Sequence, residues 1–483
     1  MADVPPNQNQ APAEQPPAGE GEEGPLYLGD EAAEDNDDEA FIDLDDPENQ
    51  VEEIDAPPAG SGAGADGQAQ PEDEEEEEPQ GEFPVAKEPV RDDAVFTWAA
   101  AENQPLHTVA AHPSKPSIVA VGGEAEHITV LDVSRRAGAS SSPAIFDKHA
   151  HTDTITQLTF SPDGAMLASG SMDCTVKLWD TTTYSLLHTL EDLAGEVEFL
   201  LWHPSSKVLL GGGADAQCLL WNVAKGAVAQ YFVGHRGPVT CGAWAMDVKK
   251  VLTGSNDGTL MLFNPKTGEC DAAISKDLST VKAGVTCVAA ANKAADLFVA
   301  GCEDGSLHVV SAAKSKVMKS LDDIHEQAVE AISFSDLSGN VGLFATCSCD
   351  CKVVVWASHD FTVRSVTRCG EGVTRLLWAN ELLIAGCTDG DTRVWDGRVA
   401  AGEPRTALMG HRQLVLGLAL AADGSHVFSV ADDGTAKAFV KARYTLDEPS
   451  IAQAAVKEAT EKAHALGGIP PPQAAAADDD EEA

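Results

Sequence analysis

Four sets of side chains in this sequence combine a histidine with a hydroxyl group and a carboxylate, groups that acid–base and nucleophilic catalysis use. In each set a His precedes a Ser or Thr, then an Asp, then a Trp or Phe. Buried His and Asp side chains are costly unless they are hydrogen-bonded, so their regular recurrence favours a structural role over catalysis. The sets are His151 (or His149), Ser169, Asp173 and Trp179; His325, Thr346, Asp350 and Trp356; His235, Thr253, Asp257 and Phe263; and His411, Ser429, Asp433 and Phe439.

Three alternating cysteines, Cys347, Cys349 and Cys351, raise the question of a metal site. Structural zinc sites prefer C-x-x-C pairs with a second Cys or His pair at a fixed distance, and the sequence has none. It also has no G-x-S-x-G elbow, phosphate-binding loop or H-E-x-x-H motif. We therefore expect no metal, no cofactor and no enzymatic activity.

The elements that position these side chains repeat eight times. Each unit has a strand of small residues, a turn that usually contains Asp, and a β-branched strand; the units close at residues 132, 180, 222, 264, 311, 357, 396 and 440. A period near 40–45 residues is the signature of a β-propeller with four antiparallel strands per blade. We predict an all-β, eight-bladed propeller over residues 94–440, closed by pairing of Val95–Trp98 with the last blade.

The repeats resemble the WD-repeat family, with Gly-His-like pairs such as Gly234-His235 and Gly410-His411 opening several units. The segments GEVEFLLWHP, GHRGPVTC, GVTRLLW and RVWDGR (from 195, 234, 372 and 393) resemble more closely the angio-associated migratory cell protein family. The WD-repeat resemblance implies that each His set forms a buried hydrogen-bonded tetrad. The closer one implies a function like that of a fungal counterpart, a dedicated chaperone for a large-subunit ribosomal protein. The first unit departs from the pattern with Ala125 in place of Asp, and three units have Leu193, Val281 and Cys369 in place of His.

Charge divides the chain into three parts. Residues 1–93 contain 31 Asp and Glu against 2 Lys and Arg, residues 94–440 contain 38 against 26, and residues 441–483 contain 9 against 4. We expect 1–93 to be a disordered acidic leader, because it is too polar to bury a core. Within it, the segment 37–55 sets apolar residues among carboxylates and is either a binding motif or part of a solubilising tail. Residues 441–483 are expected to form a C-terminal tail, with a short helix over 451–466 as one alternative and a frayed tail as the other.

A protein of net charge −46 repels nucleic acid and anionic lipids, so its natural partner is basic. The sequence has eleven cysteines, no signal peptide and no long apolar run, so we expect a protein with free thiols in the cytoplasm, with the nucleus as an alternative. Carboxylates also fall at positions that should line one opening of the propeller channel. Either they form an acidic mouth for a cationic segment, or they are scattered surface charges; they are Glu124, Glu196, Glu198, Glu303, Glu330 and Asp432.

These observations favour a non-catalytic, monomeric protein that holds a basic ribosomal protein through the acidic mouth for assembly of the large (60S) ribosomal subunit. The ribosomal partner is implied by the family resemblance alone. A scaffold in signalling or cell migration is an alternative. A third hypothesis, a substrate receptor of a cullin–RING ubiquitin ligase, rests on the short motif WDGR, Trp395–Arg398.

Overall fold

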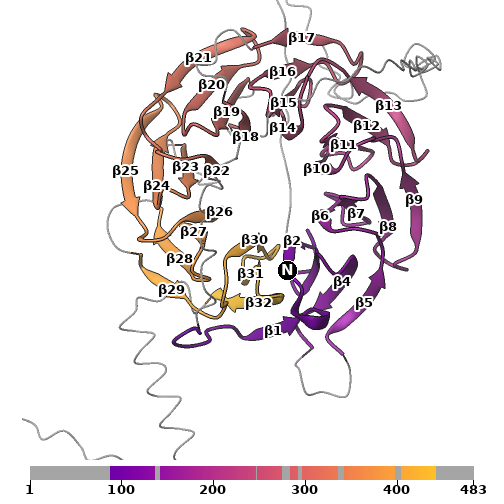
Figure 1. Cartoon of the computed structure of the whole chain (residues 1–483), viewed down its shortest axis with the longest axis vertical. Helices are drawn as coiled ribbons and strands as arrows, with labels where there is room; N and C mark the ends of the chain where they lie inside the picture. Colours follow the sequence, from indigo (N-terminus) through magenta and orange to yellow (C-terminus); the bar gives the residue numbers. More distant parts are fainter. Residues whose placement is uncertain are drawn as a thin grey trace, which may run out of the picture. The chain divides into compact units, whose positions relative to one another are not determined.

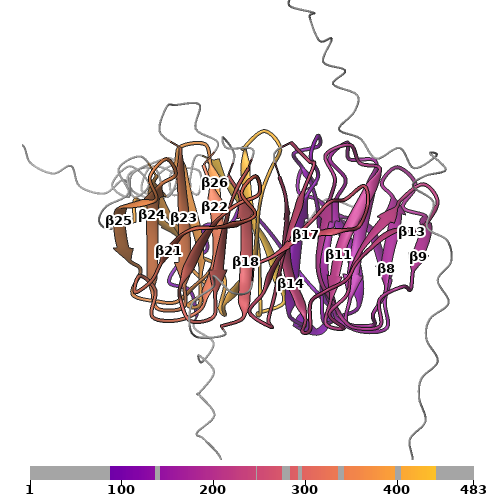
Figure 2. The same ribbon diagram turned by 90° about the horizontal axis from the view of Figure 1, so that it is seen from above.

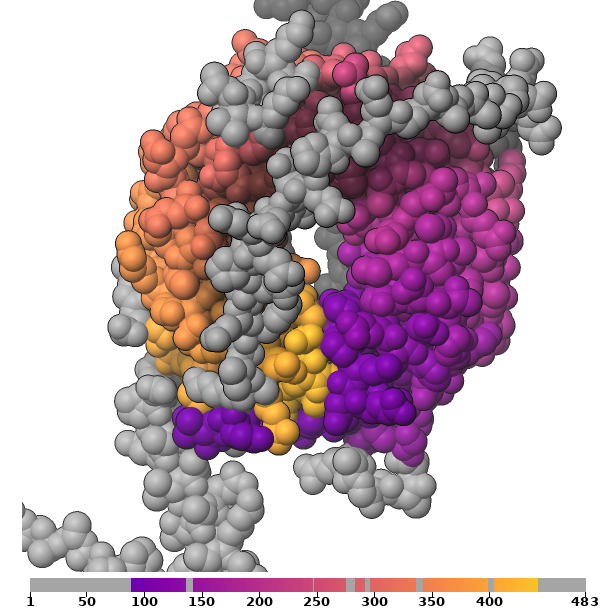
Figure 3. Space-filling model, viewed as in Figure 1, coloured from indigo at the N-terminus to yellow at the C-terminus, as the bar shows by residue number. Residues whose placement is uncertain are grey.

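The computed structural model describes residues 88–135, 142–245, 247–274, 283–291, 296–335, 342–397 and 404–441. In these residues, strands form eight four-stranded antiparallel sheets arranged as blades around a central opening, so the predicted eight-bladed propeller is confirmed (Figures 1 and 3). Seen from the side, the blades form one layer whose depth is about one strand length (Figure 2). In the described ranges, no helix is long and apolar enough to span a membrane.

In seven blades the strands follow the chain order from the innermost strand outward, and in blade 8 the outermost strand is the N-terminal strand. Blade 1 contains β2 (Leu106–Ala111), β3 (Ile118–Gly123), β4 (His127–Asp132) and β5 (Ala144–His149); blade 2 contains β6 (Ile155–Phe160), β7 (Met166–Ser171), β8 (Val176–Asp180) and β9 (Leu186–Leu190). Blade 3 contains β10 (Val197–Trp202), β11 (Val208–Gly213), β12 (Cys218–Asn222) and β13 (Ala227–Phe232); blade 4 contains β14 (Val239–Trp244), β15 (Val251–Ser255), β16 (Leu260–Phe263) and β17 (Cys270–Ala273).

The second half of the propeller repeats this arrangement. Blade 5 contains β18 (Val285–Ala290), β19 (Leu297–Cys302), β20 (Leu307–Ser311) and β21 (Lys316–Leu321); blade 6 contains β22 (Val329–Phe334), β23 (Leu343–Ser348), β24 (Lys352–Ala357) and β25 (Thr362–Arg368). Blade 7 contains β26 (Val373–Ala379), β27 (Leu382–Cys387), β28 (Thr392–Asp396) and β29 (Thr406–Leu408); blade 8 contains β30 (Val415–Leu420), β31 (His426–Ala431), β32 (Thr435–Val440) and β1 (Phe96–Ala99). The 3-10 turn η3 (Ala101–Asn103) leads from β1 to blade 1.

Small residues in the second strand of each blade allow neighbouring blades to approach closely. A Cβ atom on Gly170 would lie 2.5 Å from Val197 Cγ1, and one on Gly254 would lie 2.6 Å from Val285 Cγ1. Each valine begins the innermost strand of the following blade. Glycine is therefore required for packing between blades at these positions.

The last blade is completed by the N-terminal strand. Phe96 pairs with Ala438 and Ala99 pairs with Thr435, which confirms the predicted closure. Contacts begin before the strand: the Asp93 N–H donates to the Met409 carbonyl at 2.8 Å, and Lys437 Nζ lies 2.7 Å from an Asp92 carboxylate oxygen. Residues that the sequence assigned to the acidic leader therefore also hold the propeller closed.

The flanking predictions lie largely outside the described residues. Of the leader, residues 88–93 are described, and of the tail, only Lys441 is. The predicted helix over 451–466 and the acidic segment 37–55 lie outside them.

Candidate functional site

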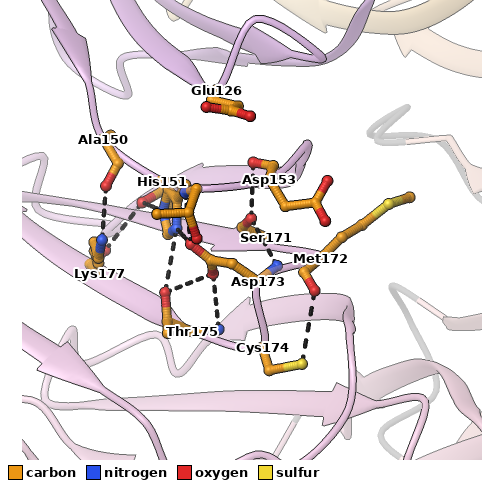
Figure 4. Close-up of polar contacts among 12 residues, drawn as sticks. Glu126, Ala150, His151, Asp153, Ser171, Met172, Asp173, Cys174, Thr175 and Lys177 are labelled. Atoms are coloured by element: carbon orange, nitrogen blue, oxygen red, sulfur yellow. Dashed lines mark hydrogen bonds and ion pairs between the residues drawn. The ribbon is translucent and has the colours of Figure 1, made fainter.

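The tetrad of blade 2 is a continuous hydrogen-bonded chain. His151 Nδ1 lies 2.9 Å from Asp173 Oδ2 and Nε2 lies 2.8 Å from Ser169 Oγ, while Trp179 Nε1 donates to Ser169 Oγ at 3.1 Å. Because a carboxylate only accepts, Nδ1 carries the proton and Nε2 accepts from the serine hydroxyl. Figure 4 shows His151 pointing at Asp173, which Thr175 also contacts at 2.7 Å.

The tetrad of blade 6 has the same geometry. His325 contacts Asp350 at 3.2 Å and Thr346 at 2.9 Å, and Trp356 Nε1 donates to Thr346 at 3.1 Å. The His325 side chain is fully buried. The imidazole is bonded at both nitrogens and has no solvent-exposed surface, so the arrangement links the strands of the blade from within the core.

The two sets that end in phenylalanine differ in one position. His235 contacts Thr253 at 2.8 Å and Thr259 at 2.7 Å, but its Nδ1 lies 3.9 Å from Asp257, which reaches it through Thr259. In blade 8, His411 contacts Ser429 at 2.7 Å and Asp433 at 3.3 Å. Phe263 and Phe439 fill the Trp position without a donor and are fully buried.

In the tetrads of blades 2 and 6, the pKa values of the histidine and of the aspartate are both lower than those of the same side chains at a protein surface. Burial lowers the pKa of His151 and of His325 below the ordinary value, despite the nearby aspartates. Burial alone would raise the pKa of Asp173, but hydrogen bonds from Thr175 and the Thr152 N–H, with His151, outweigh it and lower that pKa to about 2. The histidine is thus neutral and the aspartate ionised at neutral pH.

We expect this pairing to make stability depend on pH. Because the pKa of His151 is lower in the folded state, protons bind preferentially to the unfolded chain, and stability is lost as the pH falls below about 6.5. A second loss follows between about pH 4 and pH 2 as Asp173 protonates. Urea unfolding of the parent and of His151→Gln at several pH values tests the first loss. The difference in unfolding free energy between the parent and the variant should become smaller from pH 7 to pH 5. A constant difference would contradict a neutral His151 in the folded protein.

Removing a tetrad carboxylate should destabilise the propeller. Asp173→Ala or Asp350→Ala leaves a buried histidine N–H without its acceptor, which should cost about 1–3 kcal/mol of unfolding free energy. Asp271→Ala is the control, because Asp271 forms a partly exposed pair with Lys250 and should cost less than about 1 kcal/mol. Thermal unfolding measures both. Unchanged midpoints for both tetrad variants would show that the aspartates do not stabilise the blades.

Blades without the tetrad histidine use other polar contacts. Leu193 is buried in blade 3, where Trp221 Nε1 donates at 2.9 Å to Asp192, a residue that the sequence analysis did not identify. In blade 7, which has Cys369 instead of His, Arg393 pairs with Asp389 at 2.7 Å. In blade 1, beyond Ala125, His127 contacts Asp147 at 2.8 Å. Val281 lies outside the described residues.

The six predicted mouth residues lie at one end of the blades. The start of each innermost strand pairs with the end of the second strand, as Val197 pairs with Gly213 and Val329 with Ser348. Glu196, Glu198 and Glu330 lie at or just before the starts of innermost strands. The other three residues directly follow the second strand of their blade; they are Glu124, Glu303 and Asp432. Because all eight blades have the same topology, all six residues lie on one face of the propeller.

A β-bulge occurs at the second residue of every innermost strand. Threonine occupies this position in four blades, and its hydroxyl donates to the first residue of the next innermost strand at 2.5–2.6 Å; these are Thr156, Thr240, Thr286 and Thr374. Glu198 and Glu330 occupy the same position in blades 3 and 6. An ionised carboxylate cannot donate a hydrogen bond, so Glu198 and Glu330 cannot form the bond to the next blade that threonine forms here. They place negative charge at the channel opening instead.

The mouth has two groups of carboxylates, and within each group the side chains lie close together. The pKa of Glu198 is raised by burial and then by Glu196, and the pKa of Asp432 is raised by burial and then by Glu124. The group around Glu196 contains more carboxylates than the sequence indicated. Burial and then Asp173, Glu196, Asp215 and Asp153 raise the pKa of the Cys174 thiol, so Asp215 and Asp153 lie near the same thiol as Glu196. Glu303 and Glu330 have other contacts, to the Gly284 N–H at 3.2 Å and to Cys349 Sγ at 3.7 Å. The charge therefore has two dense centres and two separate carboxylates.

Cations balance this face only in part. Arg412 Nη2 lies 3.3 Å from Glu88, and His107 Nε2, which adds positive charge only when the imidazole is protonated, lies 3.6 Å from Glu124. In the described innermost strands, Arg375 is the one Lys or Arg. A cationic segment placed at the mouth would relieve the repulsion within each group.

The residues of the cysteine and WDGR motifs that the structure describes are buried or partly buried. Cys347 is buried, and burial followed by Glu330 raises the pKa of Cys349 to about 11, so its thiol is a poor metal ligand at neutral pH. No group of three or more potential ligands that could hold a metal occurs in the described part of the chain. Trp395 is 4% exposed, and Arg398 lies outside the described residues.

The WD40 repeat model (WD domain, G-beta repeat) matches residues 143–180, 226–264 and 402–439. The human angio-associated migratory cell protein is 28% identical over 361 residues, which cover 72% of this chain and 80% of that protein. The crystal structure of Chaetomium thermophilum Sqt1 superimposes with a TM-score of 0.66 at 23% identity, covering 74% of this chain and 99% of that one. A second Sqt1 structure, bound to the N-terminus of the ribosomal protein L10, has a TM-score of 0.64 at 22% identity, covering 72% and 100%.

Proposed function

Because this chain is a WD40-repeat protein homologous to the angio-associated migratory cell proteins, we propose that it is a chaperone for a basic ribosomal protein of the large subunit. The observation that carries the proposal is the pair of dense carboxylate groups at the mouth, Glu196 with Glu198 and Glu124 with Asp432. A propeller of the same fold has been crystallised with the N-terminus of ribosomal protein L10, which supports a partner of this class.

The charges of the mouth explain how a cationic segment would bind. Burial and a second carboxylate destabilise the anionic forms of Glu198 and Asp432, so a guanidinium or ammonium group placed at the mouth would stabilise them. Arginine can bind a carboxylate through two parallel hydrogen bonds, which adds direction to the attraction. The net charge of −46 extends the attraction and raises the association rate.

In this function the protein acts without catalysis and as a monomer, in the cytoplasm or nucleus. It shields a newly made cationic segment from nucleic acid until the segment is transferred to the assembling subunit. Direct RNA binding is disfavoured, because the mouth repels phosphates.

Titration of the full chain with a synthetic peptide of the N-terminal segment of L10 tests the proposal. We expect one-to-one binding that weakens as salt rises from 0.05 M to 0.5 M, because ion pairs are screened. A peptide of the same composition in shuffled order should bind more weakly. No binding at 0.05 M salt, or equal binding of both peptides, would contradict a dedicated chaperone function.

A further inference from the structure

The outer surface of blades 5 and 6 is basic, unlike the rest of the propeller rim. Their outermost strands, β21 and β25, contain Lys316, Lys319, Arg364 and Arg368 and no acidic residue. The outermost strands of the other six blades together contain two aspartates and one lysine. Lys314 lies two residues before β21 begins at Lys316, so five cations gather on this surface, which we call the basic rim.

The basic rim is continuous and partly apolar. Lys319 Nζ in blade 5 donates to the carbonyls of Asp360 and Phe361 in blade 6, both at 3.0 Å. The two strands follow one another around the outside of the propeller (Figure 1). Met318, Val363 and Val366 are 42%, 40% and 50% exposed among the cations.

The cations of the basic rim are not neutralised by direct contacts. In the described part of the chain, none of the five forms an ion pair with a carboxylate. Asp322 and Asp323 follow β21 and Asp360 precedes β25, and the charges of Arg364 and Arg368 act on Asp360 and Glu326 without a direct ion pair. A surface with excess positive charge and exposed apolar side chains fits a ligand with the opposite charge and its own apolar residues.

We propose that the basic rim binds the acidic segment 41–54 of the same chain, which lies outside the described residues. This segment, FIDLDDPENQVEEI, has six Asp and Glu, no Lys or Arg, and five large apolar residues, which are Phe41, Ile42, Leu44, Val51 and Ile54. Its carboxylates complement the five cations, and its apolar residues complement Met318, Val363 and Val366.

Covalent connection favours this occupant over a separate protein. Thirty-three residues, 55–87, link the segment to Glu88, and they can span up to about 110 Å. A blade of four strands is about 15 Å wide from the channel to the rim. Two opposite blades and the channel between them are therefore narrower than the span of the linker, so the segment can reach any blade. Tethering raises its effective concentration to about the millimolar range. The outer edge of β25 also has backbone groups that no described strand pairs, and an extended segment can add to such an edge.

Competition with a labelled peptide tests the proposal. The probe is a fluorescent synthetic peptide of residues 41–54, titrated into the full chain at low salt. In the parent, the attached segment should compete with it. Substituting the five apolar residues of the attached segment by serine should free the basic rim, and the probe should then bind at least tenfold more tightly.

Matched variants of the serine-substituted chain locate the site. Lys316→Gln with Arg364→Gln should weaken binding of the probe at least tenfold. Lys115→Gln with Lys249→Gln removes two exposed cations on other blades and should change it less than twofold. Equal binding by the parent and the serine-substituted chain would overturn intramolecular occupancy, and equal effects of the two glutamine pairs would overturn the assignment to the basic rim. A single-stranded RNA oligonucleotide that displaces the probe and binds more tightly than it would also overturn the proposal, in favour of a nucleic-acid surface. The basic rim faces outward, away from the mouth, so these outcomes do not depend on the ribosomal partner.

Discussion

Reversing four mouth carboxylates, Glu196, Glu198, Glu330 and Asp432, to lysine should weaken binding of the L10 N-terminal peptide at least about 100-fold at low salt, which is about 2.8 kcal/mol. Each substitution removes an attraction and adds a repulsion. The largest effects should come from Glu198 and Asp432, because both are partly buried and their raised pKa values reflect a carboxylate neighbour. Removing one partner of a desolvated charge pair typically costs about 2–5 kcal/mol, whereas exposed pairs contribute about 0.2–1 kcal/mol.

A control with the same change in net charge separates local contact from the overall field. Asp247, Glu269, Asp360 and Asp423 lie in exposed turns at the opposite end of the blades. Reversing these four should weaken binding less than about threefold at 0.15 M salt, where screening acts beyond about 8 Å. Equal losses from the two quadruple variants, with both folded by circular dichroism, would mean that net charge and not the mouth governs binding.

The repeat was predictable because the signal within one unit is local. A small-residue strand, a turn and a β-branched strand lie within fourteen residues in Leu167–Asp180, and the structure has β7 and β8 over this range. Seven of the eight predicted closing positions coincide with the last residue of the third strand; the exception is residue 264, one residue beyond the end of β16 at Phe263. Local periodicity and turn chemistry are sufficient for such elements.

Contacts between segments that are distant in the sequence were not predictable in the same way. The position of Glu198 at the opening was predicted, but the β-bulge there, which lies between β10 and β11 of blade 3, was not, because the sequence around it carries no distinctive turn residue. Asp192 accepts from Trp221 across 29 positions in the sequence, where no histidine pattern indicates a contact. The grouping of Asp153 and Asp215 with Glu196 likewise brings together different turns. These contacts are set by tertiary packing, which a pattern within one repeat does not encode.

The closing strand allows a test of whether the eight blades depend on one another. Deleting residues 1–99 removes β1, exposes the edge of β32, and removes Phe96, which is 7% exposed and packs with Phe428. Loss of the Phe96 side chain alone should cost about 3–5 kcal/mol, and the pairing of Lys437 with Asp92 is lost as well. We therefore expect a lower unfolding midpoint and concentration-dependent aggregation through the open edge.

Deleting residues 1–87 is the matched control, because it leaves every described contact of the closing segment in place. It removes only the proposed contact of segment 41–54 with the basic rim, whose tenfold effect on probe binding corresponds to about 1.4 kcal/mol, so its unfolding midpoint should stay within about 5 °C of the parent. Phe96→Ala in the full chain should fall between the two deletions. If the longer deletion unfolds at the parent temperature and stays monomeric, blade 8 is stable with three strands, and closure by β1 is not what holds the eight blades in a ring.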